Sequence, residues 1–326
     1  MKGTVCLVTG ATGFIGSHLV RELASRGADV HAAARSGSAP GSLEPSSGRV
    51  THHRLDLRDR AALERCITSV QPQKVFHLAA QTRDPASQSI SDLAKSFADC
   101  IDPLVHLLDL LAGAASPPQV MVRAGTIAEY GKAMLPYRED QREYPQSPYG
   151  ARMLAATQIC EMLDARVPFP VHTARLALTY GDGQSHGFLL PALIDACRKG
   201  LPTEILRPDD RRDLIHVSDV VDALIRLGES GLAEGTTVNI ATGTAPTMRD
   251  VAARVIAISG CDPALVTLGS PGPCVKPSVL LASPAKAQRQ LGWSARIALD
   301  DGLRMMLGRA MQEDLHADVQ VRARCG

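Results

Sequence analysis

The chain has 326 residues, which is enough to bury a large core and to form two domains, or one domain with a substantial lobe. Its 35 Lys and Arg and 34 Asp and Glu give a formal net charge of +1. This balance excludes a broad basic face for nucleic acid and an acidic tail, so we expect a small ligand that is neutral or locally anionic.

The start of the chain and its cysteines indicate a cytoplasmic protein. Met1-Lys2-Gly3 leads directly into an apolar strand, without the longer apolar stretch and cleavage site of an export signal. No stretch approaches ~20 consecutive apolar residues, so we expect no membrane partner. The eight cysteines are scattered, with no CxxC and no pair at metal-ligand spacing, which predicts reduced thiols and no metal site.

The first half of the chain alternates between strand-like and helix-like segments. Most of the strand-like runs are separated by stretches with helical periodicity, and this order predicts an α/β fold with a doubly wound parallel sheet covered on both faces. The strand-like runs are residues 4–9, 29–34, 50–53, 74–79, 119–124 and 171–178.

Beyond about residue 181 the alternation is less regular and predicts a second, smaller lobe interleaved with returns to the sheet. We assign residues 1–178, with returns near 214–241, to the sheet domain, and residues 179–213 and 242–326 to the smaller lobe. The elements expected in this half are helices at 188–199, 218–227, 247–259 and 283–291, a polar loop at 207–213 and a strand at 214–217.

A glycine-rich turn lies between the first strand and the first helix, in the segment Thr9-Gly10-Ala11-Thr12-Gly13-Phe14-Ile15-Gly16. Gly10 can adopt the tight turn, Gly13 leaves room for a pyrophosphate to approach backbone N–H groups, and Gly16 lets the helix pack closely on the sheet. The positive end of the helix dipole then faces the phosphates. Because strand, spacing and helix agree, the turn predicts a Rossmann domain that binds NAD or NADP.

The end of the second strand favours NADP over NAD. NAD enzymes usually place an acidic residue there to bind the ribose 2′-hydroxyl, but this segment reads His31-Ala32-Ala33-Ala34-Arg35-Ser36. Arg35 can pair with a 2′-phosphate. The alternative is that Arg35 is a solvated loop arginine without a role in binding, in which case NAD is also possible. Asp56, just after the third strand and next to Leu57, is a candidate adenine contact or a loop cap.

Five further motifs connect the chain to a known family. They are Phe76-His77-Leu78-Ala79-Ala80, Glu129-Tyr130-Gly131, Ser147-Pro148-Tyr149-Gly150, Arg212-Asp213 before Val217-Ser218-Asp219-Val220, and Leu291-Gly292-Trp293. With the glycine-rich turn they make the chain resemble, over nearly its whole length, the NAD(P)-dependent epimerase/dehydratase family of extended short-chain dehydrogenases. Within that family it is most similar to the nucleotide-linked 4-keto-6-deoxyhexose reductases, the group typified by GDP-4-keto-6-deoxymannose reductase.

The resemblance implies a nucleotide-sugar substrate, which the lobe at 179–213 and 242–326 would bind, and a homodimer. In many relatives two long helices form the dimer interface, and the stretches 89–111 and 149–163 are the candidates here. Together with the glycine-rich turn, the resemblance predicts that the cofactor is bound by Gly10, Thr12, Gly13, Phe14, Ile15, Gly16, Arg35, Ser36, Asp56, Leu57, Leu78, Ala79 and Ala80.

The resemblance also assigns the catalytic groups. Tyr149 corresponds to the family's catalytic tyrosine and Thr126 to its Ser/Thr partner. Hydride reaches the carbonyl carbon while the developing alkoxide must receive a proton, so a phenol and a hydroxyl should converge on that oxygen. Arg212 falls where the family binds the substrate's diphosphate, although a surface salt bridge within 209–213 is the alternative. Arg175, at the end of the sixth strand, is a further candidate for substrate binding or a structural residue.

One position breaks the family's Tyr-x-x-x-Lys pattern, because Met153 stands where the lysine should be. A unit charge ~4 Å from the phenol contributes about 4 kcal/mol at an effective dielectric near 20, and without it the phenol should keep a pKa of roughly 10. A reductase needs Tyr149 protonated, whereas an epimerase first needs it as a base, so Met153 favours carbonyl reduction. Arg152 is expected to point about 100° away around the helix and not to replace the lysine. The alternative is a core methionine in an inactive site.

Other departures narrow the function. Sugar 4,6-dehydratases follow their threonine with an Asp-Glu pair, but Ile127-Ala128 cannot transfer protons, which argues against dehydration. Two asparagines of the family are replaced by Asp99 and Leu178, which puts the inherited substrate contacts in question. His77 is assigned a structural hydrogen-bonding role, and His216 is left without a role.

These observations lead to three hypotheses. The first is an NADPH-dependent reductase of a nucleotide-activated 4-keto-6-deoxyhexose. The second is a nucleotide-sugar 4-epimerase, which would keep its cofactor through turnover and consume no NADPH. The third, which the loss of the lysine keeps open, is a non-catalytic NAD(P)-binding protein that acts as a sensor or subunit.

Overall fold

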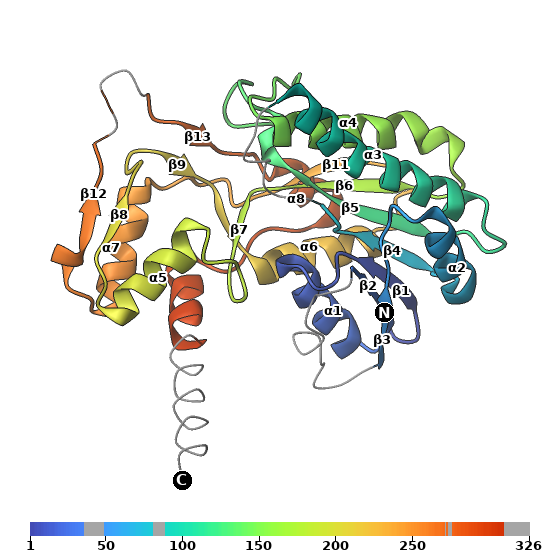
Figure 1. Ribbon diagram of the computed structural model, residues 1–326, viewed down its shortest axis with the longest axis horizontal. Helices are drawn as coiled ribbons and strands as arrows, with labels where there is room; N and C mark the ends of the chain where they lie inside the picture. Colours follow the sequence, from blue (N-terminus) through green and yellow to red (C-terminus); the bar gives the residue numbers. More distant parts are fainter. Residues whose placement is uncertain (36–48, 81–88, 271, 273–275, 310–326) are drawn as a thin grey trace, which may run out of the picture. The chain divides into compact units, whose positions relative to one another are not determined.

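The computed structural model describes residues 1–35, 49–80, 89–270, 272 and 276–309. The chain divides into two compact units, each assembled from separate stretches of sequence (Figure 1). Unit 1 comprises Met1–Leu176, Val220–Ile240 and Ala282–Ser294, and unit 2 comprises Ala177–Asp219, Ala241–Leu281 and Ala295–Gly326. Within the described ranges, no helix combines the length and apolar character needed to cross a membrane.

Unit 1 is built on a seven-stranded parallel sheet, which confirms the predicted doubly wound α/β fold. The strand order is β11-β6-β5-β4-β1-β2-β3, so the chain reverses its direction of travel across the sheet beside β1. Ligands of such sheets bind at the carboxyl ends of the strands at this switch point. The strands are β1 Val5–Thr9, β2 Asp29–Ala34, β3 Arg49–Arg54, β4 Lys74–His77, β5 Val120–Thr126, β6 Val171–Leu176 and β11 Thr237–Ile240.

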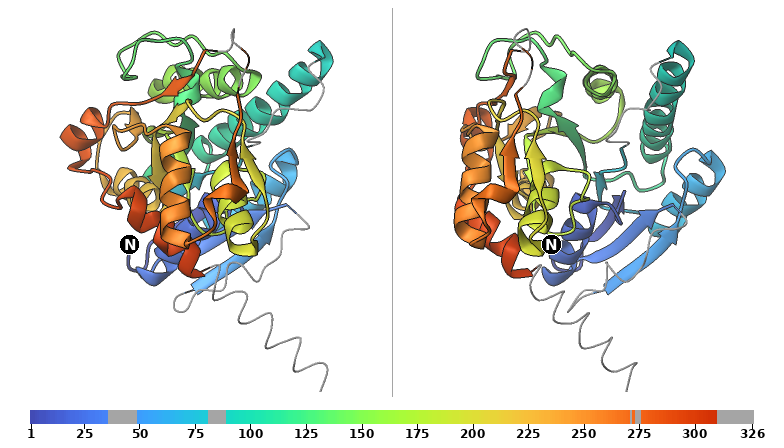
Figure 2. Two further views of the ribbon diagram at one scale, coloured as in Figure 1. Left: turned by 90° about the vertical axis from the view of Figure 1, so that its left-hand side faces the viewer. Right: turned by 60° about the vertical axis from the view of Figure 1, so that its left-hand side comes forward.

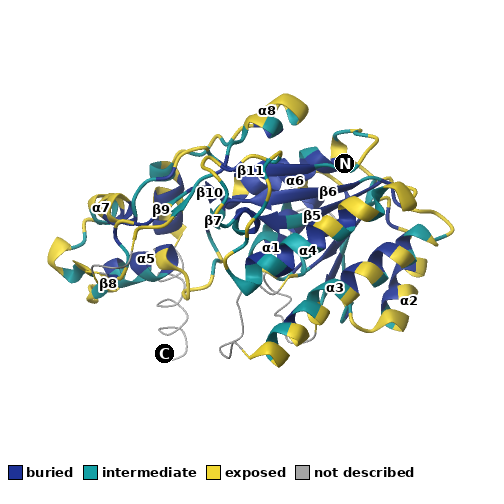
Figure 3. Cartoon of the chain, turned by 90° about the horizontal axis from the view of Figure 1, so that it is seen from above, coloured by how far each residue is buried: buried dark blue, intermediate teal, exposed yellow. Residues whose placement is uncertain are grey.

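Helices cover both faces of this sheet (Figure 2). On one face, α2 (Arg60–Val70), α3 (Ile90–Ala112) and α4 (Pro148–Leu163) bury their apolar sides against β1, β4 and β5 in one hydrophobic cluster. On the other face lie α1 (Phe14–Ser25) and α6 (Val217–Glu229); Gly228 of α6 packs so closely that an added Cβ would lie 2.9 Å from the Phe76 ring. Figure 3 shows the result, with buried inner helix sides and exposed outer ones. Apolar residues at helical spacing produce this pattern.

Unit 2 is smaller and mixes helices with short parallel strand pairs. Helices α5 (Leu189–Lys199) and α7 (Met248–Ser259) pack together around a core that includes Leu193, Val251 and Leu303, the last from the helical stretch 299–309. The strand pairs are β7 Leu178–Tyr180 with β10 Leu214–His216, β8 Thr203–Ile205 with β12 Val266–Leu268, and β9 Arg211–Arg212 with β13 Val279–Leu280. The remaining elements, α8 Ala285–Leu291 and the 3-10 helices Ile127–Glu129 and Asp164–Arg166, belong to unit 1, and the 3-10 helix Pro263–Leu265 to unit 2.

Apart from shifts of one or two residues, the unit boundaries differ from the predicted ones in two stretches. Residues 214–219, predicted as part of the return to the sheet, lie in unit 2, and residues 282–294, predicted as part of the smaller lobe, lie in unit 1. Long-range contacts decide the second case: Ala282 forms a bridge with Tyr137, and Lys286 Nζ donates to the Thr237 carbonyl at 2.8 Å. The buried indole of Trp293 fixes the end of this segment.

Candidate active site

The glycine-rich turn has the geometry of a phosphate-binding loop. Gly10 has φ +70°, and a Cβ there would lie 2.7 Å from the backbone of Leu78 and Ala79; a Cβ on Gly16 would lie 2.1 Å from the Gly10 carbonyl oxygen. Both positions therefore require glycine. A Cβ on Gly13 would meet only Gly10 O, at 3.1 Å, so this residue leaves space beside the turn.

Helix α1 starts directly behind this turn. Its N-cap, Gly13, has no side chain to cap the helix, and the first turn contains no acidic residue. The first amides of the helix and the positive end of its dipole therefore suit an anionic group. These residues fit the pyrophosphate of a dinucleotide.

The other predicted cofactor residues lie at the same carboxyl edge of the sheet. Leu78 and Ala79 follow β4 and back the glycine turn, and Ala80 is exposed beyond them. Arg35 is exposed immediately after β2, while Ser36 lies outside the described residues.

Asp56 is held by a neighbouring side chain. Its carboxylate accepts from Arg58 N at 3.0 Å and from Arg58 Nη2 at 2.6 Å, and these hydrogen bonds lower the pKa of Asp56 to about 2. This geometry matches the loop-cap alternative. Leu57 packs partly against the core cluster under α2.

His77 has a structural setting. Its Nδ1 lies 2.8 Å from Thr9 Oγ1, which links β4 to β1 inside the sheet. Burial lowers the pKa of His77 to about 3, so the ring is neutral near pH 7.

Tyr149 and Thr126 meet at the carboxyl end of β5. Thr126 is the last residue of that strand, and Tyr149 is in the first turn of α4, which begins where Ser147 accepts from Gly150 N at 3.0 Å. A Cβ on Gly150 would lie 2.6 Å from the Ala128 carbonyl oxygen, so the start of α4 packs directly on the turn after Thr126. Burial raises the pKa of Tyr149, and its hydrogen bond with the Thr126 side chain opposes this rise. The two predicted catalytic groups thus converge.

The position of the expected lysine is filled by an apolar side chain. Met153 is 2% exposed, and its backbone carbonyl accepts from Thr157 Oγ1 at 3.2 Å. No ammonium group can act on the phenol from this position.

Arg152 does not point away from Tyr149, contrary to the expectation from the helical wheel. Its guanidinium carbon lies 5.6 Å from the centroid of the Tyr149 ring, and its Nη1 donates to Ser96 Oγ on α3. Residues three apart share a helix face, and long side chains lean toward the preceding turn, which brings this arginine back over the tyrosine. Its charge also lowers the pKa of Tyr149, although burial dominates.

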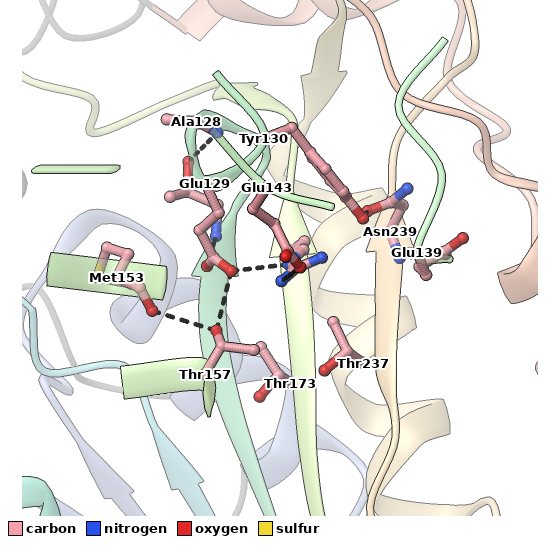
Figure 4. A network of polar contacts seen from close by, with 12 residues as sticks. Ala128, Glu129, Tyr130, Glu139, Glu143, Met153, Thr157, Thr173, Thr237 and Asn239 are labelled. Atoms are coloured by element: carbon pink, nitrogen blue, oxygen red, sulfur yellow. Dashed lines mark hydrogen bonds and ion pairs between the residues drawn. The ribbon is translucent and has the colours of Figure 1, made fainter. Parts of the chain in front are cut away.

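A buried ion-pair network contacts Thr126 through Glu129, which Figure 4 shows together with Glu143 and Thr157. The Glu129 side chain is fully buried; its Oε1 accepts from Thr126 N at 3.0 Å, and its Oε2 lies 2.7 Å from Arg175 Nε and 2.9 Å from Thr157 Oγ1. Arg175 Nη2 also pairs with Glu143 Oε1 at 2.6 Å. Arg175 is 1% exposed, so the structure favours its structural alternative over substrate binding.

Sequence reasoning missed the role of Glu129. The signal was present, because Thr126 and Glu129 have the Ser/Thr-x-x-Glu spacing of a capping box, and the structure shows both of its hydrogen bonds. What the sequence did not show is that the same carboxylate meets Arg175, 46 residues away.

Within unit 2, Arg212 is held in place by its neighbours. Its Nη2 lies 2.6 Å from Asp210 Oδ2 and 2.8 Å from Ser278 Oγ, and its Nη1 donates to the Ser278 carbonyl at 2.9 Å. Its role in diphosphate binding stays a prediction, and the intermediate exposure of its side chain is compatible with it. His216 caps α6, where its Nδ1 accepts from Ser218 N at 3.3 Å.

A family model described as "NAD dependent epimerase/dehydratase family" matches residues 6–241, which includes the glycine turn, Thr126 and Tyr149. The chain belongs to this family. It is therefore an NAD(P)-dependent enzyme of the extended short-chain dehydrogenase type.

The most similar curated relatives include two that act on deoxysugars by name. GDP-6-deoxy-D-mannose reductase from Pseudomonas aeruginosa is 27% identical over 308 residues, covering 92% of this chain and 95% of the relative. The dTDP-6-deoxy-L-talose 4-dehydrogenase (NAD(P)(+)) from Kitasatospora kifunensis is 30% identical over 312 residues, covering 91% and 92%. Relatives of comparable identity carry epimerase names.

Among solved structures, MoeE5 in complex with UDP-glucuronic acid and NAD superimposes with a TM-score of 0.83. It is 31% identical, and the match covers 94% of this chain and 99% of MoeE5. Its fold agrees with the Rossmann architecture of unit 1.

Proposed function

We propose that the protein reduces the 4-keto group of a nucleotide-activated 4-keto-6-deoxyhexose with NADPH. The observation that carries the proposal is the partly buried phenol of Tyr149, whose pKa is raised by desolvation, next to Thr126 and without a lysine at position 153. A phenol with a raised pKa stays protonated at neutral pH and suits proton donation, not proton abstraction. The names of two relatives that match over nine-tenths of this chain support the substrate class.

Different residues of the chain bind the cofactor, orient the carbonyl group and donate the proton. The nicotinamide cofactor, when bound, supplies the hydride, and the Gly10–Gly16 turn with the start of α1 would hold its pyrophosphate. Thr126 Oγ1, fixed by the donating Ala128 N–H at 3.2 Å, orients the carbonyl oxygen and the phenol. Tyr149 donates its proton to that oxygen as the alcohol forms, and regains a proton from solvent before the next turnover.

Arg152 takes over the electrostatic part of the missing lysine's role. Proton donation leaves a phenolate on Tyr149, and the guanidinium lying over this ring stabilises the negative charge. Arg152 does not occupy the position of the missing lysine, because its guanidinium donates to Ser96 on α3. We therefore assign it the charge function alone.

The cofactor preference and the assembly are part of the same proposal. Arg35, exposed at the end of β2 with no carboxylate at that position, favours NADPH over NADH. We also propose a homodimer through α3 and α4, whose outer surfaces include the exposed side chains of Val105 and Met162. Light scattering on a size-exclusion column tests the mass of the assembly.

The direct test supplies the purified enzyme with NADPH and a freshly generated 4-keto-6-deoxyhexose linked to GDP or dTDP. We expect loss of absorbance at the reduced-nicotinamide band with stoichiometric formation of the 6-deoxyhexose. Tyr149→Phe, which keeps the ring, should lower kcat by roughly 10²- to 10⁴-fold.

Two outcomes contradict the proposal. Interconversion of 4-epimers with tightly held cofactor and no NADPH consumption identifies the epimerase. Cofactor binding by calorimetry with no turnover of any sugar nucleotide identifies a non-catalytic protein.

A further inference from the structure

Two thiols touch in unit 2, far apart in the sequence. Cys261 Sγ donates to Cys197 Sγ at an S–S distance of 3.1 Å, and both cysteines are free thiols in the described structure. Cys197 lies in the last turn of α5, and Cys261 follows the end of α7 directly.

The fold itself brings these two positions together. Helices α5 and α7 both end at a glycine with positive φ, Gly200 at +63° and Gly260 at +68°. Beyond each glycine the polypeptide leads to a short strand, β8 after α5 and β12 after α7. These two strands pair in parallel, with Thr203 opposite Val266. Cys197 precedes Gly200 and Cys261 follows Gly260, so the two cysteines lie near the helix ends of two helix–strand units whose strands pair.

The two thiols differ in their exposure to solvent. Cys197 is 7% exposed, and burial together with the adjacent Cys261 thiol raises the pKa of Cys197 to about 12. Cys261 has intermediate exposure, so an oxidant in solution reaches it first. The sulfurs must approach by about 1 Å to reach a disulfide bond of ~2.05 Å, and the glycine-terminated helix ends can absorb this movement.

We propose that Cys197 and Cys261 are a modification site at which a hydroperoxide drives formation of an intramolecular disulfide. The Cys261 thiolate attacks a peroxide oxygen, the O–O bond breaks, and a sulfenic acid and hydroxide form. The Cys197 sulfur then attacks the sulfenic sulfur and expels hydroxide, which takes up the thiol proton as water. Overall two thiols are oxidised to one disulfide while hydrogen peroxide is reduced to two waters.

The experiment treats the full-length protein with a small excess of hydrogen peroxide, alkylates the remaining thiols and maps the peptides without reduction. We expect a cross-linked pair of peptides containing Cys197 and Cys261, a mass loss of two hydrogens, and full reversal by dithiothreitol. Closing a loop between helices α5 and α7 should also raise the Tm of the oxidised protein by several degrees.

Variants separate this site from the other cysteines. Cys197→Ser and Cys261→Ser should each abolish the cross-link and the shift in Tm, whereas Cys100→Ser, which removes another half-buried thiol, should change neither. The proposal fails if Cys261 is oxidised to the sulfinic acid while Cys197 stays alkylatable, or if either thiol pairs instead with Cys274 or Cys325. The readout is independent of the proposed enzymatic activity.

Discussion

Replacing Arg152 by methionine would remove the positive charge over the ring of Tyr149 while keeping a long apolar side chain. The guanidinium carbon lies 5.6 Å from the ring centre, and the Arg152 side chain is fully buried. At an effective dielectric near 20, this separation gives about 3 kcal/mol of stabilisation for a phenolate, or roughly 2 pKa units. The phenolate that remains after proton donation would lose this stabilisation.

The effect on rate should be smaller than the full electrostatic energy. Proton transfer is only partly complete in the transition state, so about half of the energy, ~1.5 kcal/mol, should reach the barrier. We therefore expect Arg152→Met to lower kcat roughly 10-fold, with KM for the sugar nucleotide little changed. Arg152→Lys, which keeps the charge, should retain most of the activity.

A lysine at position 153 supplies the matched rescue. Met153→Lys alone should lower the pKa of Tyr149 and bring the alkaline limb of the pH profile to lower pH, because the phenol loses its proton more easily. In the Arg152→Met background the same lysine should restore kcat. The assay follows NADPH oxidation with saturating substrates from pH 6 to 10, with deuterated NADPH to show that the chemical step is measured.

Structural damage must be separated from lost charge, since Arg152 also contacts Ser96. Each variant is first compared with wild type by thermal unfolding and by NADPH affinity. The reasoning is refuted if folded Arg152→Met keeps wild-type kcat, or if the added lysine restores no activity to it.

Three other predictions use different parts of the molecule. Arg35→Ala should raise KM for NADPH about 10- to 100-fold, from the loss of one charge-assisted phosphate contact, and leave KM for NADH unchanged; equal changes for both cofactors would contradict the NADP preference. Glu129→Gln should reduce the free energy of unfolding by about 3–5 kcal/mol in urea because it leaves the buried Arg175 charge with less compensation, and adding Arg175→Met should recover part of this loss; additive effects would show that the pair is not coupled. His77 has a folded-state pKa of about 3, below its unfolded value, so the unfolded state takes up the proton first and the free energy of unfolding falls as the pH drops below about 6.5. His77→Asn should therefore remove about 1 kcal/mol of the difference in the free energy of unfolding between pH 7 and 5.5. If this difference is unchanged in the variant, other groups cause it.

The amino-acid sequence was sufficient to predict the features that depend on local spacing. Gly10, Gly13 and Gly16 are separated by the distances that a strand-to-helix turn demands, and the structure shows the close backbone contacts that require glycine at the first and third. Thr126 and Tyr149 were predicted to lie together because each stands at the end or start of an element whose type the pattern predicts, and the structure brings their side chains into contact. Their catalytic roles stay a prediction. Met153 was recognised as a departure by position alone.

The tertiary structure decided which side chains meet. The helical wheel predicted that Arg152 points away from Tyr149, but the length of the side chain and its contact with Ser96 on α3 bring its charge over that ring. Glu129 pairs with Arg175 across two strands, and Cys197 meets Cys261 across two helix–strand units. Periodicity reports which face of an element is buried, whereas a contact between residues 46 or 64 positions apart depends on how the sheets and helices pack, and this is not encoded in any local stretch of the chain.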